Sequence, residues 1–237
     1  MSSRRRRPGR FRQLIPRPPD AAVVEPAAAF ARMDATEARS IATSAVLEQA
    51  FSGWSPEATE TAGATVGASR RVAAAVLLTL LGEDDLSLVL IRRATHLRAN
   101  PGEIAFPGGR IEPGELPLDA ALREAEEEVA LPLKAVRVLG ALPPVLRAAR
   151  PEPIAAFVAR VHDAAAVRWA PNPAEVADLL ITPVSRLMDP AGYWEEAWTR
   201  PDGQVWRMSF FDLGEDVVWG ASARILVSFF DRLVGAR

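Results

Sequence analysis

The stretch that decides the fold reads Phe106-Pro-Gly-Gly-Arg-Ile-Glu-Pro-Gly-Glu-Leu-Pro-Leu-Asp-Ala-Ala-Leu-Arg-Glu-Ala-Glu-Glu-Glu-Val-Ala-Leu131. It begins with a tight turn that contains two adjacent glycines. It continues into residues 116–129, where the apolar side chains recur every three or four positions. This period predicts an amphipathic helix with one face toward a core.

Three glutamates of this helix, Glu124, Glu127 and Glu128, fall within one arc, because each helical residue advances by about 100°. Like charges at this spacing destabilise an isolated helix. The helix macrodipole also disfavours anions in the C-terminal half. A positive charge nearby would offset both effects. The alternative is an exposed acidic helix face with Arg110 and Arg123 nearby.

Outward from this stretch, the chain alternates between strand-like and helix-like segments. Residues 72–81 and 86–91 predict a hairpin, and residues 194–198 and 205–211 predict a second one around Pro201-Asp-Gly203. The remaining strand candidates are 135–141, 154–161 and 175–181, and the remaining helix candidates are 183–188 and 221–234. Strands on both sides of one central helix indicate a mixed α/β domain, expected over residues 70–237.

The N-terminal part reads differently. Residues 1–32 are rich in Arg, Pro and Ala without a sustained period, so we expect a disordered basic leader that catalysis does not need. Residues 33–69 are expected to hold a helix from Asp34 to Phe51, with Glu37 completing a capping box, followed by a linker.

Composition excludes several kinds of chemistry. The chain of 237 residues has no cysteine, which rules out a thiolate nucleophile, a disulfide and a Cys-ligated metal site. It has two histidines, which argues against a His-rich metal site. Any metal would take oxygen ligands, which favours Mg²⁺, Mn²⁺ or Ca²⁺. The longest apolar run is about half of a membrane span, and the N-terminus lacks a secretory signal. We therefore expect a cytoplasmic protein with no membrane or nucleic-acid partner.

The central stretch resembles the Nudix box of the Nudix hydrolases. That box reads Gly, five residues, Glu, seven residues, Arg-Glu, an aliphatic residue, any residue, Glu-Glu, any residue, Gly, and an aliphatic residue. Eight of the nine positions agree here, and Ala130 replaces the last glycine. The matching places are Gly109, Glu115, Arg123, Glu124, Ala125, Glu127, Glu128 and Leu131.

The resemblance implies an α/β/α sandwich with a mixed sheet and a central catalytic helix. It also implies Mg²⁺- or Mn²⁺-dependent hydrolysis of a diphosphate in a small nucleotide substrate. In this interpretation Arg123 pairs with Glu115, and Glu124 or Glu175 is the catalytic base. The implied metal ligands are the carbonyl of Gly109 with Glu124, Glu127 and Glu128.

Further segments are similar to bacterial coenzyme A pyrophosphatases of this superfamily: residues 93–109, 172–176 and 218–225. The resemblance favours coenzyme A or acyl-CoA, cleaved to 3′,5′-ADP and a phosphopantetheine. ADP-ribose, dinucleotides and a regulatory nucleotide-binding domain without turnover are the alternatives, and a homodimer is possible. The expected substrate-binding residues are Arg93, Arg98, Asn100 and Gly108, with Arg92 and His96 as further candidates for phosphate contact.

Overall fold

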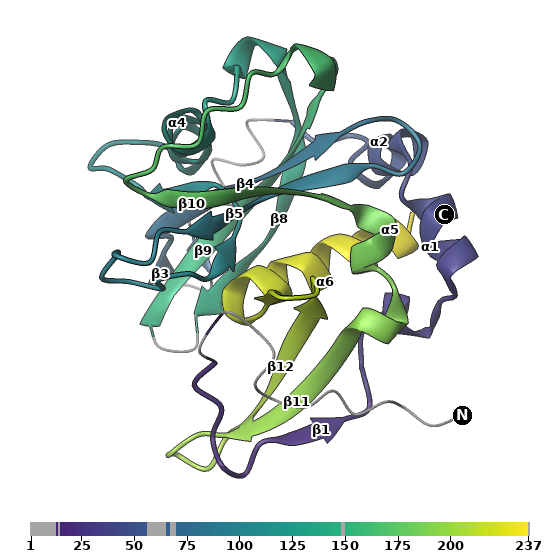
Figure 1. The fold of residues 1–237 in the computed structure, drawn as a ribbon, viewed down its shortest axis with the longest axis vertical. Helices are drawn as coiled ribbons and strands as arrows, with labels where there is room; N and C mark the ends of the chain where they lie inside the picture. The colour runs from purple at the N-terminus through teal and green to yellow at the C-terminus, as the bar shows by residue number, and fades with distance from the viewer. Residues whose placement is uncertain (1–12, 14, 56–64, 67–69, 148–149, 237) are drawn as a thin grey trace.

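The computed structural model describes residue 13 and residues 15–55, 65–66, 70–147 and 150–236. Its centre is a seven-stranded sheet in the order β10-β5-β4-β9-β8, with β6 beside β5 and β7 beside β4 (Figure 1). Strands β4 and β9 run parallel, and the other recorded pairs of this sheet are antiparallel. The strands are β4 (Ala74–Leu81), β5 (Ser87–Arg93), β6 (Ile104–Ala105), β7 (Gly108–Arg110), β8 (Val136–Arg147), β9 (Arg150–Val161) and β10 (Val176–Pro183).

Helices cover both faces of this sheet (Figure 1). Side chains alternate between the faces of a strand, so Leu77 of β4 joins the core under α4 (Pro117–Val129). Its neighbour Leu78 joins the core under α6 (Gly220–Val234), which buries Phe229. The expected α/β/α sandwich with a mixed sheet is confirmed.

A second sheet, in the order β1-β11-β12-β13, lies beyond α6 (Figure 1). Its strands are β1 (Ala22–Val24), β11 (Tyr193–Thr199), β12 (Val205–Asp212) and β13 (Val217–Val218). Trp198 lies opposite Trp206, so the second predicted hairpin is confirmed. The two sheets are joined by an ion pair that both Nη atoms of Arg92 form with the carboxylate of Asp216.

The expected leader is wrong over residues 15–32. Ala22 pairs with Ala197 through β1 and β11, and Phe30, in the 3₁₀ helix η1 (Ala29–Arg32), is completely buried. Its ring lies 4.9 Å from that of Tyr193 and 5.1 Å from that of Phe230. Average composition indicates disorder, but the burial of Phe30 and the pairing of β1 with β11 show an ordered segment.

The helix expected over residues 34–51 is two helices, α1 (Ala35–Ile41) and α2 (Ser44–Ala50). The predicted capping box of Asp34 and Glu37 is present. Thr43 caps the second helix, because its side chain accepts a hydrogen bond from the backbone N–H of Val46. The bend between the helices docks on the β4–β5 turn, where the N–H of Leu86 donates to the carbonyl of Ala42.

Most of the expected linker, residues 56–64 and 67–69, lies outside the described residues. A two-stranded sheet is formed by β2 (Thr65–Val66) and β3 (Arg70–Arg71). The short helix expected at 183–188 is α5 (Val184–Leu187). Among the described residues there are three more 3₁₀ helices: η2 (Leu133–Ala135), η3 (Ala164–Ala166) and η4 (Pro190–Gly192). In the described part of the chain, no helix combines the length and the apolar character needed to cross a membrane.

Candidate active site

The site is built around two glycines that bring the β7 turn against helix α4. A Cβ atom on Gly109 would lie 2.3 Å from Cδ of Glu124, so a side chain there would have to displace that carboxylate. Gly108 has φ +149°, and a Cβ there would lie 2.3 Å from the carbonyl oxygen of Ala75. A side chain at Gly108 would therefore push β7 away from β4, whereas one at Gly109 would displace the Glu124 carboxylate on α4.

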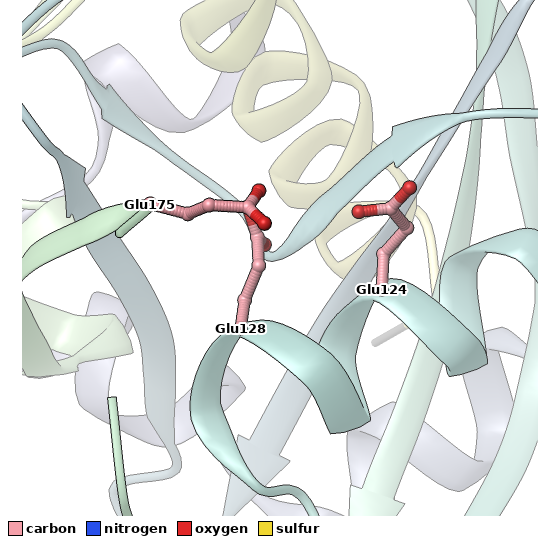
Figure 2. Close-up of side chains that lie close together, drawn as sticks. All are labelled: Glu124, Glu128 and Glu175. Carbon is pink, nitrogen blue, oxygen red and sulfur yellow. The ribbon is translucent and has the colours of Figure 1, made fainter. Parts of the chain in front are cut away.

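Three carboxylates meet at this point (Figure 2). Glu124 and Glu128 lie on α4, and Glu175 is the residue directly before β10. One carboxylate oxygen of each lies within 4.8 Å of the others. Such a group of hard oxygen ligands suits a divalent cation such as Mg²⁺ or Mn²⁺.

Glu128 is the most deeply placed of the three, with 1% of its surface exposed. Its Oε2 accepts a hydrogen bond from the N–H of Gly108 at 2.9 Å. Its Oε1 has no hydrogen-bond partner among the described residues and lies 4.0 Å from Nη1 of Arg93. A buried carboxylate oxygen without a donor is costly, which makes Oε1 the natural contact for a cation.

Burial raises the pKa of Glu128 to about 7, and the nearby Glu124 and Glu175 carboxylates add to the rise. Burial also raises the pKa of Glu124, although Arg123 opposes the shift. Burial therefore makes the ionised forms of Glu124 and Glu128 less favourable than they are in water. A divalent cation bound beside them would favour the ionised forms.

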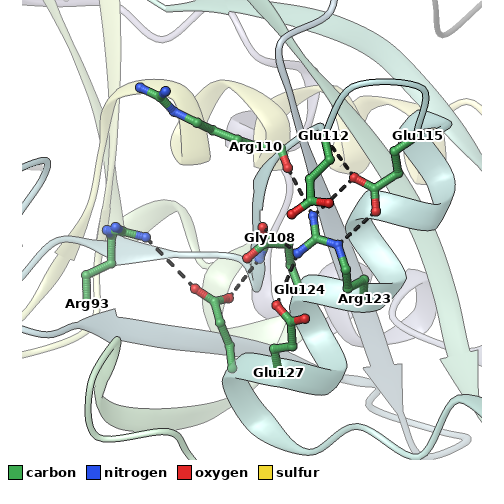
Figure 3. Close-up of polar contacts among 9 residues, drawn as sticks. Arg93, Gly108, Arg110, Glu112, Glu115, Arg123, Glu124 and Glu127 are labelled. Atoms are coloured by element: carbon green, nitrogen blue, oxygen red, sulfur yellow. Dashed lines mark hydrogen bonds and ion pairs between the residues drawn. The ribbon is translucent and has the colours of Figure 1, made fainter.

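Arg123 connects helix α4 to the preceding loop (Figure 3). Its Nε donates to Oε1 of Glu115 at 2.8 Å, and its Nη2 donates to the carbonyl of Arg110 at 3.1 Å. Its Nη1 donates to Glu124 at 3.0 Å. Hydrogen bonding from Arg123 lowers the pKa of Glu115, so this pair stays ionised. The expected contact between Arg123 and Glu115 is therefore present.

Glu127, expected among the metal ligands, points differently. Its side chain is 54% exposed and bonds Nη1 of Arg123 at 3.1 Å. Glu175, expected only as a candidate base, takes the third place in the carboxylate group. The helical spacing alone could not distinguish Glu127 from Glu128, because it gives only the direction of each side chain around the helix axis. It does not show where the loop before β10 lies.

Of the expected substrate residues, Arg93 ends β5, Arg98 and Asn100 lie on the segment between β5 and β6, and Gly108 begins β7. Nη1 of Arg93 lies 4.0 Å from Oε1 of Glu128, so Arg93 is next to the carboxylate group. Arg98 and Asn100 are exposed. Arg92, a further candidate for phosphate contact, is instead buried and paired with Asp216. The pairing is invisible in the sequence, since 124 positions separate the two residues.

Two contacts, made by Glu103 and His96, were not predicted from the sequence. Glu103 is half-buried close to Arg93, and burial raises its pKa. His96, considered a phosphate contact, has its Nε2 2.9 Å from the carbonyl oxygen of Ala174. A lone glutamate or histidine in a loop carries no periodic signal, so neither contact could be predicted.

A sandwich that holds a double-glycine turn against a glutamate-rich helix defines the fold class of the Nudix hydrolases. The family model described as "NUDIX domain" matches residues 69–224, and the chain belongs to this family. Membership places it among hydrolases of diphosphate-linked substrates.

Two relatives and one solved structure illustrate the similarity. "Uncharacterized Nudix hydrolase NudL" of Photorhabdus laumondii is 36% identical over 154 residues, covering 65% of this chain and 80% of that protein. The protein of the same name from Yersinia enterocolitica is 35% identical over 155 residues, covering 65% and 77%. A MutT/nudix family protein from Enterococcus faecalis has a TM-score of 0.45 at 15% identity, covering 82% of this chain and 75% of that one.

Proposed function

We propose that this chain hydrolyses the diphosphate of a nucleotide substrate in a reaction that requires Mg²⁺ or Mn²⁺. The observation that carries the proposal is the group formed by Glu124, Glu128 and Glu175, in which the buried Oε1 of Glu128 has no donor. When bound, the cation would neutralise the diphosphate and lower the pKa of the attacking water.

The residues around this group have separate tasks in the proposal. Arg93 would bind a phosphate oxygen, because its guanidinium lies at the edge of the carboxylate group. Arg123 would hold Glu124 and the loop of Glu115 in place. Glu124 or Glu175 would accept the proton of the attacking water. Glu127 and the carbonyl of Gly109 remain proposed as additional ligands.

Coenzyme A or an acyl-CoA is the proposed substrate, cleaved to 3′,5′-ADP and a phosphopantetheine. Support comes from the resemblance of residues 93–109 to the coenzyme A pyrophosphatases and from the exposure of Arg98 and Asn100 on this segment. Coenzyme A carries a 3′-phosphate that ADP-ribose lacks. Asn100 can donate a hydrogen bond but supplies no charge, so recognition of that phosphate would depend mainly on arginine.

The test compares kcat/KM for coenzyme A and for 3′-dephospho-coenzyme A. We expect the wild type to prefer coenzyme A, and Arg98→Ala to narrow the preference about tenfold by removing one charge-assisted contact. Arg39→Ala, an exposed arginine of α1, is the matched control and should leave the ratio unchanged.

Other outcomes select the alternatives. Equal use of both substrates, or a strong preference for ADP-ribose or a dinucleotide, would remove coenzyme A and leave a Nudix diphosphatase of another substrate. Nucleotide binding without turnover, across a substrate panel with Mg²⁺ and Mn²⁺, would indicate a regulatory domain.

A further inference from the structure

Glu175 reaches the carboxylate group from a turn, not from a helix or a strand. Its carboxylate lies beside those of Glu124 and Glu128, and like charges at this distance repel one another. Without other contacts, an isolated turn would move Glu175 away from the site. The contacts of residues 172–175 therefore decide whether Glu175 can act there.

The turn is organised by Asn172. The side-chain Oδ1 of Asn172 accepts the N–H of Ala174 at 3.1 Å, which is an Asx-turn. The carbonyl of Asn172 accepts the N–H groups of Glu175 at 3.0 Å and of Val176 at 2.8 Å. The N–H of Asn172 donates to the carbonyl of Glu128 at 2.9 Å, so the turn is fixed to the end of α4.

The segment between β5 and β6 holds the other side of the turn. The N–H of Ala94 donates to the carbonyl of Glu175 at 2.8 Å. Nε2 of His96 lies 2.9 Å from the carbonyl oxygen of Ala174. A carbonyl oxygen can only accept, so Nε2 carries a hydrogen in this contact. The residue before Glu175 is thus bonded by both Asn172 and His96.

From these contacts we infer that Asn172 and His96 are positioning residues, which hold the 172–175 turn so that Glu175 joins Glu124 and Glu128. The inference rests on the proposed metal site and assigns the two residues no contact with substrate. In this inference His96 positions the turn and does not bind phosphate. Glu175 can join the other two carboxylates only when the β5–β6 segment lies against the turn.

The test uses paired variants of the full chain. Asn172→Ala removes the acceptor of the Asx-turn, whereas Asn172→Asp keeps it. His96→Ala removes the donor, whereas His96→Gln keeps an N–H group. His162→Ala is the matched control, because His162 is the other histidine, is exposed and lies away from the turn.

Binding of Mn²⁺, followed by the electron paramagnetic resonance signal of the free ion, is the first readout, and kcat and KM are the second. We expect each alanine variant to lower Mn²⁺ affinity or kcat about two- to tenfold, the range for one hydrogen bond. The conservative variants should recover most of the loss, with KM and the thermal midpoint nearly unchanged.

A double-mutant cycle with Glu175→Gln decides whether the two residues act through Glu175. In that background His96→Ala and Asn172→Ala should have no further effect on Mn²⁺ binding. Additive losses, or alanine variants that behave like His162→Ala, would overturn the inference. A wild type that binds Mn²⁺ and hydrolyses no diphosphate would defeat the proposed function alone, and silent variants in an active enzyme would defeat this inference alone.

Discussion

Glu128 and Glu196 are buried to nearly the same extent, with 1% and 4% of their surfaces exposed, but their surroundings differ. Glu196, in the second sheet, accepts hydrogen bonds from the indole N–H groups of Trp194 at 3.0 Å and Trp198 at 2.8 Å. Nε of Arg17 lies 2.8 Å from the same carboxylate. Both of its oxygens are therefore satisfied by the protein.

Glu128 has one backbone donor, one oxygen without a hydrogen bond and two carboxylates beside it. The comparison separates a glutamate whose two oxygens are both bonded within the protein from one that keeps an oxygen without a hydrogen bond. Burial alone does not distinguish them, and the number of donors does. The rings of Trp194 and Trp198, whose N–H groups donate to Glu196, also pack against Phe210.

The largest expected effect is on stability, in the second sheet. Glu196→Gln replaces one oxygen by an NH₂ group that would face an N–H donor, and it leaves Arg17 without its counter-charge. Breaking one partner of a buried ionic cluster costs about 3–5 kcal/mol, and we expect about 3 kcal/mol in the free energy of unfolding from denaturant titration. Activity per folded molecule should persist. A loss below about 0.5 kcal/mol would show that the satisfied cluster does not stabilise the fold.

Glu128→Gln should give the opposite pattern. We expect turnover to fall more than about 100-fold, equivalent to about 2.7 kcal/mol in the barrier. Stability of the metal-free protein should stay equal or rise, because one repelling charge is removed. Steady-state kinetics and thermal unfolding would be measured on the same preparations. Glu127→Gln is the neighbouring comparison, and we expect a smaller loss because Glu127 is exposed and bonded to Arg123. Normal activity in both variants would contradict the metal site.

The third prediction concerns pH in the metal-free protein. The pKa of Glu128 rises from 4.5 to about 7 on folding, so between these values the folded state holds a proton that the unfolded state has lost. The free energy of unfolding should therefore fall as pH rises from about 4.5 to 7, by about 2.6 kcal/mol, because the slope approaches roughly 1.4 kcal/mol per unit and flattens near each pKa. Denaturant titrations in EDTA would show this slope. Glu128→Gln should flatten it, and an unchanged slope in this variant would assign it to other groups.

The smallest expected effect is at Ala130, which ends α4 two residues after Glu128 with φ 56°. Left-handed backbone costs a residue with a Cβ about 1–2 kcal/mol. Ala130→Gly should therefore raise the free energy of unfolding by about 1 kcal/mol. Activity should change less than twofold if the backbone at Glu128 is already correctly placed. A larger change in kcat would mean that the strained helix end adjusts the carboxylate.

The sequence predicted the parts of the site that lie close together along the chain. The double glycine, Glu115, Arg123 and the helix with Glu124 and Glu128 belong to a single stretch, and the structure has them in contact. Periodicity also predicted β4, β5, α4 and α6.

Contacts between distant parts of the chain could not be predicted. The pair of Arg92 with Asp216 and the insertion of Phe30 beside Tyr193 depend on side chains separated by more than 100 residues. No local period reports such partners. Glu175 lies between these two cases. The sequence indicates it as a candidate base, but its place in the carboxylate group depends on where the turn meets α4.

The pairing of β1 with β11 has a consequence for how the protein is made. Ala22 lies opposite Ala197, so the ribosome must add about 175 residues before the two strands can meet. At about 5–20 residues per second, this takes roughly 10–35 s. During that time the N-terminal segment waits without its strand partner, while the central sheet is synthesised. The first described strand to emerge is thus among the last to be completed, and a chain stopped before β11 carries that segment unpaired.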